Sequence, residues 1–519
     1  MNDLAELGAF VARLRYEDIP EDVRFAARAQ IVNMVAAAHG ACSSPEVTKL
    51  AGAVASFGGA GPATVLATGQ KLAAPDAALA NALCAMAHDF DDIVWMGHTC
   101  HSAVFAPLAV AEKEGSGARE LVCAVVAANE IGGRLGASSF LGPLNGQMIT
   151  HIHLIGAAAA TAKLLGLDEE KTTHALAISL AQPTFPLVPA FVAPTSKLLS
   201  AATPTVTGIQ AAYFARAGMT GARDLLADRR GFWKRFSFAP LPFMLGDLGT
   251  LWVLRTLSMK TYPGCHYFQT ACSSIDEILA RTGPLPVEDI RRVRVETTKV
   301  GAEVDRFGRS YDDGGTVTAV NVNFQLAVTA AVHLIAGRFT TDEMDPAWLA
   351  ASSPAIRKLV ERIEVKHDPG LTAEVLTSAR AVGAGRRALA SLGVREVVNL
   401  ARRYREEYAS SLVDADEPGG WWRLVRRFLA GEPEAQGPAI ALRFPNRVVV
   451  ELRSGRREEA SLLLPEGSLA APRAREAVER KFLHETRRTL GADRARAALA
   501  SAWALEQTTV AEFVRAAAA

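Results

Sequence analysis

The chain has 519 residues, of which 49% are hydrophobic and 21% charged, so it can build a large core. Lys and Arg number 56 and Asp and Glu 55, and this balance gives no reason to expect a nucleic-acid or membrane partner. No apolar run of about 18 residues predicts a transmembrane helix. The N-terminus shows no signal-peptide pattern, and we expect a cytoplasmic protein. The six cysteines include no Cys-x-x-Cys pair, which disfavours a disulfide scaffold, a zinc finger or a Cys-ligated iron–sulfur cluster.

The first half of the chain has a helical pattern, with apolar residues at three- and four-residue spacing and many small residues that suit close helix packing. Pro45 and Pro75 stand at first-turn positions, and Ser102 resembles an N-cap. We predict helices over residues 24–38, 45–57, 75–86, 103–113, 120–131, 155–165, 169–181 and 205–217.

After residue 259 an approximate alternation of apolar and polar residues is typical of strands. Strands are predicted near 290–295, 363–365, 440–444 and 448–450, with a turn at Pro445–Asn446 and a helix over 323–336. Residues 371–436 are Gly-rich, then Arg-rich, and we interpret them as a helical insertion. From Ala474 onward the helical pattern returns. The expected fold is mainly α: a large all-helical domain from residues 1–258 and 471–519, and a smaller α+β domain over 259–470.

Titratable residues are densest between His88 and His101, where three carboxylates and three imidazoles fall within fourteen residues. Proton abstraction next to a carboxylate needs such groups held close together on a rigid scaffold. His101 lies just before the predicted helix N-terminus at Ser102, a position that favours an anion. In the alternative interpretation, Asp89, Asp91 and Asp92 cap helices and the histidines are surface residues.

Other candidate residues lie elsewhere in the chain. His151 and His153 could ligate a metal, although residues i and i+2 of a helix do not share a face. Lys197 and Lys260 have apolar or Gly/Pro-rich neighbours, and Lys260 stands at the predicted domain boundary, where a cleft would form. The sequence has no phosphate-binding Gly-rich loop with Lys, no dinucleotide fingerprint and no nucleophile elbow, which disfavours nucleotide-dependent and α/β-hydrolase chemistry.

The segment His88-Asp89-Phe90-Asp91-Asp92, followed by His101-Ser102 and Ala111-Glu112, resembles a signature of the MmgE/PrpD superfamily. That superfamily includes 2-methylcitrate dehydratase, cis-aconitate decarboxylase and iminodisuccinate epimerase. The similarity extends over nearly the whole chain, with further motifs at 156–168, 196–197, 208–212, 231–232, 260–265, 465–467 and 481–482.

The resemblance implies a helical domain built from both chain ends, a smaller α+β lid, an active site between them, a homodimer and no required cofactor or metal. Matching the motifs residue by residue assigns catalytic positions to Asp89, His101, Lys197 and Lys260. We expect further substrate contacts from Asp91, Asp92, Ile93, Ser102, His151 and His266. The chain departs from the family pattern in four ways: Ile93 replaces a Thr of the decarboxylases, Gln147 replaces a His, the His-Pro-Ser proline is missing, and residues 92–101 are about two residues longer.

These residues predict a lyase that acts on a small di- or tricarboxylate, with 2-methylcitrate dehydratase-like elimination of water as the leading reaction. Lys197 and Lys260 would hold carboxylates, and His101 and Asp89 would be the acid/base pair. The alternatives are decarboxylation or epimerisation by the same groups, and a metal-dependent lyase or hydrolase using the Asp/His cluster. A binding protein that has lost activity is the non-enzymatic alternative.

Overall fold

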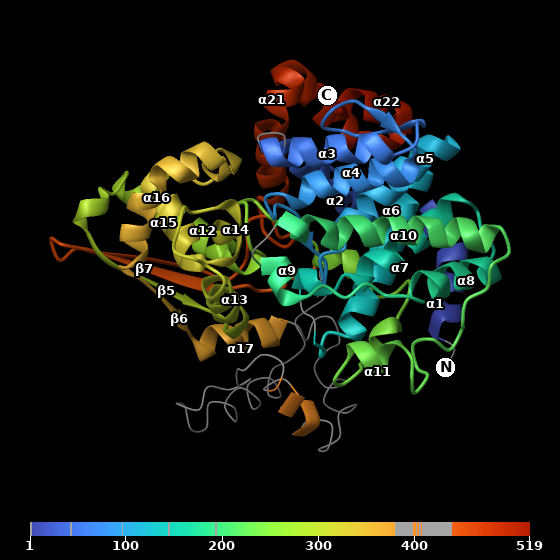
Figure 1. Ribbon diagram of the computed structural model, residues 1–519, viewed down its shortest axis with the longest axis horizontal. Helices are drawn as coiled ribbons and strands as arrows, with labels where there is room; N and C mark the ends of the chain where they lie inside the picture. The colour runs from blue at the N-terminus through green and yellow to red at the C-terminus, as the bar shows by residue number, and fades with distance from the viewer. Residues whose placement is uncertain are drawn as a thin grey trace.

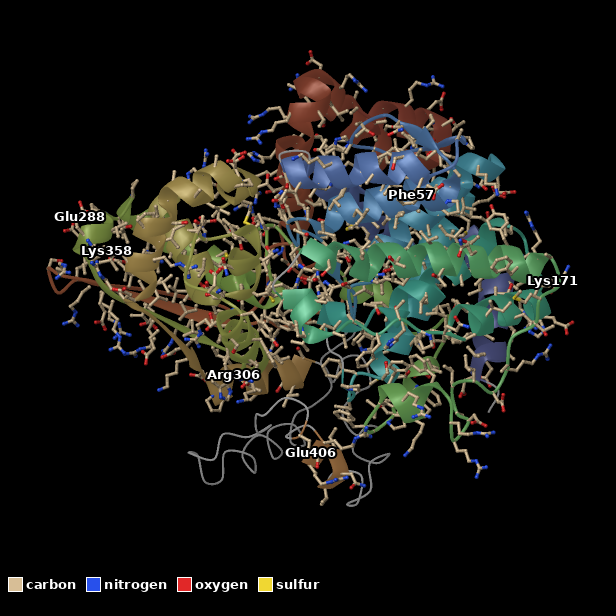
Figure 2. The ribbon with its side chains drawn as sticks, in the orientation of Figure 1. Phe57, Lys171, Glu288, Arg306, Lys358 and Glu406 are labelled. Atoms are coloured by element: carbon tan, nitrogen blue, oxygen red, sulfur yellow. The ribbon has the colours of Figure 1, made fainter. Side chains whose placement is uncertain are left out.

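The computed structural model describes residues 3–41, 44–95, 97–143, 146–192, 195–378, 398–400, 402–403, 406 and 439–519. Its fold is mainly α, as predicted, with one four-stranded sheet and two short strand pairs among these residues. None of the described helices is long and apolar enough to cross a bilayer. Charged side chains such as Lys171, Glu288 and Lys358 point outward (Figure 2).

The larger part of the molecule is built from helices of both chain ends (Figure 1). Its N-terminal helices are α1 (Asp3–Arg13), α2 (Glu21–Gly40), α3 (Pro45–Phe57), α4 (Ala74–Met86), α5 (Cys100–Glu114), α6 (Ala118–Ser138), α7 (His151–Leu164), α8 (Glu169–Ser179), α9 (Val188–Val192), α10 (Leu199–Arg216) and α11 (Phe232–Phe236). From the other end, α21 (Ala474–Trp503) packs against α2 and α22 (Val510–Ala517). Phe482 and Phe513 of these late helices share one apolar core with Leu7 and Val32.

Close packing of α7 against α10 depends on small residues. A Cβ added to Gly208 of α10 would lie 2.6 Å from Ala157 Cβ and would also overlap the carbonyl oxygen of Leu154. We expect Gly208→Ala to lower the free energy of unfolding by about 1–3 kcal/mol, because a packed core does not accept the extra methyl group. Gly52 of α3 is the matched control: its Cβ would meet nothing within 4 Å, so Gly52→Ala should raise stability by about 0.5–1 kcal/mol. Urea unfolding measures both, and equal shifts would contradict this packing account.

The smaller part contains a sheet with strand order β6-β5-β7-β8. Its strands are β5 (Ile290–Thr297), β6 (Ile363–His367), β7 (Asn446–Leu452) and β8 (Arg457–Leu462), and only β5 and β6 run parallel. The helices of this part are α12 (Gln269–Thr282), α13 (Lys299–Ser310), α14 (Ala319–Phe324), α15 (Leu326–Ala336), α16 (Pro346–Val360) and α17 (Pro369–Ser378). A second apolar core joins Ile275 of α12 to Val293 of β5 and Val450 of β7.

Four local predictions are wrong. Residues 440–444 form no strand, because their backbone bonds go to two different segments: Ile440 N donates to Arg255 O, and Phe444 N donates to Leu463 O. The turn predicted at Pro445–Asn446 is also absent, because Asn446 is the first residue of β7. The helix predicted over 323–336 is broken at Gln325, whose extended backbone separates α14 from α15. Helix α5 begins at Cys100, so Ser102 is not its N-cap. The predicted insertion at 371–436 lies largely outside the described residues, and the domain boundaries stay predictions.

Candidate active site

Two short strands bring distant residues of the site together. Strand β3 (Asp92–Ile93) pairs antiparallel with β4 (Ser258–Met259), and Lys260 N donates to Asp91 O at 3.0 Å. Asp89 has a φ of 52°, a left-handed conformation that Asp tolerates better than most residues. The pairing therefore fixes Lys260 beside the acidic segment, although 168 residues separate Lys260 from Asp92 in the chain (260 − 92).

Two carboxylates and two ammonium groups form the centre of the cluster. Lys260 Nζ lies 3.1 Å from Asp89 Oδ1 and 2.5 Å from Asp91 Oδ1, and Lys197 Nζ lies 3.3 Å from Asp89 Oδ1. The side chains of all four residues are at most 3% exposed. Burial alone would lower the pKa of Lys260, but Asp89 and Asp91 raise it well above its usual value, so this lysine stays charged. For Lys197 burial prevails and lowers the pKa, with Asp89 opposing the shift.

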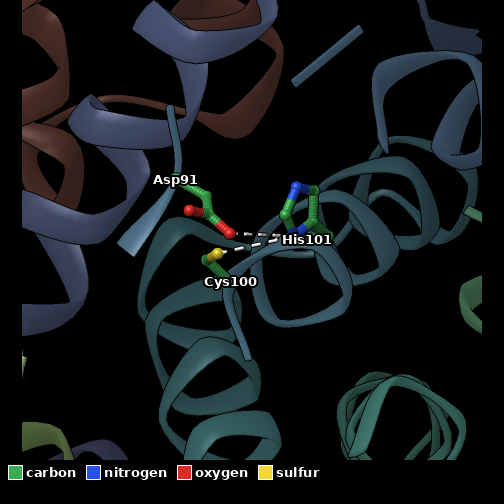
Figure 3. Close-up of side chains that lie close together, drawn as sticks. All are labelled: Asp91, Cys100 and His101. Atoms are coloured by element: carbon green, nitrogen blue, oxygen red, sulfur yellow. Dashed lines mark hydrogen bonds and ion pairs between the residues drawn. The ribbon is translucent and has the colours of Figure 1, made fainter. Parts of the chain in front are cut away.

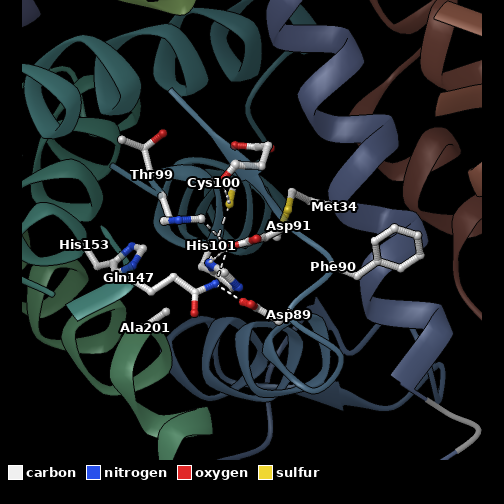
Figure 4. A network of polar contacts seen from close by, with 12 residues as sticks. Met34, Asp89, Phe90, Asp91, Thr99, Cys100, His101, Gln147, His153 and Ala201 are labelled. Atoms are coloured by element: carbon white, nitrogen blue, oxygen red, sulfur yellow. Dashed lines mark hydrogen bonds and ion pairs between the residues drawn. The ribbon is translucent and has the colours of Figure 1, made fainter. Parts of the chain in front are cut away.

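Two imidazoles and an amide surround Asp91. His98 Nδ1 lies 2.9 Å from Asp91 Oδ2, whereas His101 Nδ1 lies 3.9 Å from the same oxygen. Gln147 Nε2 donates to Asp91 Oδ2 at 2.9 Å and also to Asp89 Oδ1 (Figure 4). Burial would raise the pKa of Asp91, but His98 and Lys260 hold it well below its usual value. Asp91 is therefore an ionised acceptor at the centre of the cluster.

His101 is fully buried in α5, and burial lowers the pKa of its imidazole to about 4, with Asp91 opposing the shift. Its ring packs edge-on against His153, whose Nδ1 lies 3.1 Å from Ser102 Oγ. Ser102, predicted as a substrate contact, thus bonds to a neighbouring histidine and to the carbonyl of Thr99.

The remaining predicted contacts divide into two groups. His266 is buried against Phe444 and borders the cluster: burial lowers the pKa of its imidazole well below the usual value, Lys260 and His98 lower it further, and Asp91 opposes the shift. His151 does not: its Nε2 lies 3.1 Å from Ser139 Oγ, and its ring packs on Phe232 and Phe236 of α11. Ile93 packs with Leu442 and Phe444 on the side of the α/β part.

Asp92 bonds to helix α2. Its carboxylate accepts hydrogen bonds from Gln30 Nε2 and Asn33 Nδ2 of α2, both at 3.1 Å. Burial, with the charge of Asp91, raises the pKa of Asp92 to about 7. Asp92 therefore supports the acidic segment by joining it to α2.

The raised pKa of Asp92 predicts a pH-dependent contribution to stability. A carboxyl group with a raised folded-state pKa stabilises the fold fully below its unfolded pKa, and this stability is lost as pH rises through about 7. Between about pH 4 and pH 8 we expect the free energy of unfolding of the unmodified chain to fall by about 2–4 kcal/mol more than that of Asp92→Asn. Urea unfolding at the two pH values measures the difference, and parallel pH profiles would contradict the assignment.

Three polar residues that contact the cluster or its backbone were not among the predicted site residues: His98, Gln147 and Lys481. Lys481 of α21 donates to the carbonyls of Phe90 and Lys260, at 2.6 and 3.2 Å, and to Asn33 Oδ1. Burial lowers the pKa of Lys481 to about 7, with Glu485 opposing the shift. The motif that contains Lys481 was visible in the sequence, but its contact with residues near position 90 depends on the packing of α21 against α2.

Three buried ring nitrogens of the cluster have no hydrogen-bond partner among the described residues: His101 Nε2 and both ring nitrogens of His266. Buried polar groups are nearly always hydrogen-bonded, so unpaired ones require an explanation. An anionic or hydroxylated ligand would supply the missing acceptors. The unpaired atoms therefore favour a binding site for a small carboxylate over a purely structural network.

In the described part of the chain, one trio of donor atoms could converge on a cation: Asp91, Cys100 and His101 (Figure 3). Lys260 already lies against Asp91, which places a competing positive charge there. Burial also raises the pKa of the Cys100 thiol well above 9, and a metal binds the thiolate form. The trio fits a proton-transfer network better than a metal centre.

Comparisons with known proteins show which family the chain resembles. Models of the MmgE/PrpD N-terminal and C-terminal domains match residues 5–242 and 262–401. The chain is 25% identical to the cis-aconitate decarboxylase of Homo sapiens over 222 residues, which are 41% of this chain and 44% of that one. It is 26% identical to the Aspergillus terreus cis-aconitate decarboxylase over 314 residues, 56% of this chain and 64% of that enzyme.

The cis-aconitate decarboxylase-like protein oryM of Aspergillus oryzae is 25% identical over 393 residues, 70% of this chain and 80% of that protein. The matched regions thus span less than two thirds of the human and A. terreus enzymes. Because the two domain models together match most of its length, the chain belongs to the MmgE/PrpD family.

Proposed function

We propose that this chain is a lyase for a small di- or tricarboxylate, and that it uses its own side chains to move a proton next to a substrate carboxylate. The observation that carries the proposal is the buried arrangement of Lys197 and Lys260 around Asp89, bordered by unpaired imidazole nitrogens. Removing such a proton builds negative charge on the substrate, and preorganised cations in a dry site stabilise that charge strongly.

Each group has a role that follows from its contacts. Lys197, whose Nζ lies 3.3 Å from Asp89 Oδ1, holds a substrate carboxylate, and Lys260 holds the charge that develops next to it. An imidazole exchanges protons with the substrate and Asp91 orients it, while Asp89 holds the two ammonium groups in place. Such groups each contribute about 10²–10⁴-fold to a rate.

Elimination of water from a β-hydroxy acid, as by a 2-methylcitrate dehydratase, is the reaction for which we propose these roles. It needs one group that removes a C–H proton and one that protonates the departing hydroxyl, and the cluster offers both carboxylate and imidazole groups. The curated relatives favour a second candidate, decarboxylation of an acid of the cis-aconitate class. Decarboxylation passes through a carbanion stabilised by the same cations.

A panel of substrates distinguishes these reactions. The purified protein is incubated separately with 2-methylcitrate, citrate, cis-aconitate and an aspartate-derived imine. New ultraviolet absorbance without released CO₂ indicates elimination, and released CO₂ indicates decarboxylation. A fall in optical rotation with unchanged composition would indicate epimerisation instead, and the lyase proposal would then be wrong. Activity that disappears on chelation and returns with a divalent metal would favour the metal-dependent alternative.

The homodimer and the cytoplasmic location remain proposals from the sequence. Sedimentation of the purified chain tests the first: a mass near twice 55.2 kDa is expected.

A further inference from the structure

His98 lies between β3 and α5, directly after a turn that a pair of backbone hydrogen bonds closes. Val94 N donates to Gly97 O at 2.9 Å and Gly97 N donates back to Val94 O at 3.1 Å. Within the turn Trp95 has a φ of 54°, and its N–H donates to Thr256 Oγ1 at 2.6 Å. These bonds fix the turn to the segment that precedes β4 and hold His98 over Asp91. This turn falls in the segment that is about two residues longer than the family pattern.

The contact between His98 and Asp91 determines which ring nitrogen can react. Asp91 Oδ2 lies 2.9 Å from Nδ1, and Lys260 on Oδ1 keeps the carboxylate ionised, so Asp91 can only accept. Nδ1 therefore carries the hydrogen, and in the neutral ring Nε2 has the free lone pair. A carboxylate that fixes an imidazole in this tautomer also stabilises the imidazolium formed when Nε2 takes a proton.

The contacts of His101 support a proton-transfer role less well. Its Nδ1 is 3.9 Å from Asp91 Oδ2 and 3.6 Å from Cys100 Sγ, so no carboxylate hydrogen bond fixes its tautomer. Its side chain is 0% exposed, whereas that of His98 keeps 5% of its surface accessible. A group that exchanges protons with a substrate must be reachable from the space that the substrate occupies.

We propose that His98, oriented by Asp91, is the catalytic acid/base of this site, and that His101 supports the cluster from α5. This assignment rests on the proposed lyase function. His98 Nε2 takes the proton from the carbon next to the substrate carboxylate, and the C–H electron pair forms the new C=C bond. The C–O bond breaks with its pair on oxygen, which takes the proton from the His98 imidazolium and leaves as water. In decarboxylation, the imidazolium protonates the carbanion left by departing CO₂.

The test compares His98→Gln with His101→Gln on the substrate that the unmodified chain turns over best. We expect His98→Gln to lower kcat about 10²–10⁴-fold and His101→Gln to lower it less than about tenfold. Binding of the same carboxylate, measured by calorimetry, should change less than about threefold in His98→Gln. In D₂O the unmodified chain should exchange the substrate C–H proton, and His98→Gln should not.

A second variant keeps the test informative if Gln perturbs the turn. His98→Ala with added imidazole should regain turnover, whereas His101→Ala with imidazole should not. Full activity in His98→Gln together with loss in Asp89→Asn would overturn the role of His98 and leave the lyase proposal standing. No turnover of any panel substrate by the unmodified chain would overturn both.

Discussion

Replacing Lys260 by Met is expected to abolish turnover and to lower the free energy of unfolding by about 3–5 kcal/mol. Lys260 Nζ contacts Asp89 and Asp91, and both carboxylates are buried. Without the ammonium group these charges lose their main partner, and breaking a buried ion pair costs far more than breaking an exposed one. The developing substrate charge loses the same cation, so kcat should fall at least about 10³-fold. Steady-state kinetics and urea unfolding measure the two effects.

Two control variants separate chemistry from folding. Lys171 lies on the surface of α8 (Figure 2), and Lys171→Met should leave both quantities unchanged. The double variant Asp91→Asn/Lys260→Met removes one charge of each sign and should recover part of the lost stability without regaining activity. Recovery of turnover in the double variant would show that Lys260 serves the fold alone.

Asp89→Asn should lower kcat about 10³-fold or more while the fold stays intact. Asn has the same shape as Asp and tolerates the left-handed backbone that position 89 requires. The substitution removes the carboxylate that contacts Lys197, Lys260 and Gln147. Activity within a few-fold of the unmodified chain would show that the reaction does not need the Asp89 carboxylate.

Asp305→Asn is the matched control for this change. Asp305 is also fully buried, and it pairs with Arg309 at 2.9 Å in α13 of the α/β part. Asp305→Asn should lower the free energy of unfolding at least as much as Asp89→Asn does, while kcat remains unchanged.

Helices with regular apolar spacing could be predicted from the sequence, whereas segments held by single long-range bonds could not. The stretch 75–86 has such spacing and forms α4 within one residue of the prediction. The alternation of Ile440, Leu442 and Phe444 is that of a strand, yet Ile440 packs into the helical core and the other two against Ile93. Alternation indicates that every second side chain is buried, and it does not indicate whether the backbone has a strand partner.

The site could be predicted only where neighbours in the sequence are neighbours in space. The density of Asp89, Asp91 and Asp92 indicates a site. Which of them contact the lysines and which one supports the fold depends on Gln30 and Asn33 of α2, which bind Asp92. His98 belongs to the dense segment and Gln147 stands where the family pattern has a His, but neither was assigned to the site, because a lone amide or imidazole is most often structural. Their contacts with Asp91 arise from loop geometry that residue types do not encode.

The most direct test of the central claim is proton NMR of the carboxylate panel in D₂O, with the unmodified chain and Asp89→Asn side by side. The account predicts that at least one di- or tricarboxylate loses water or CO₂ next to its carboxylate with the unmodified chain, and that Asp89→Asn leaves that substrate intact over the same period. Equal conversion by both proteins would contradict a lyase centre built on the buried Asp89–Lys197–Lys260 cluster, as would a panel that the folded, unmodified chain leaves wholly unchanged.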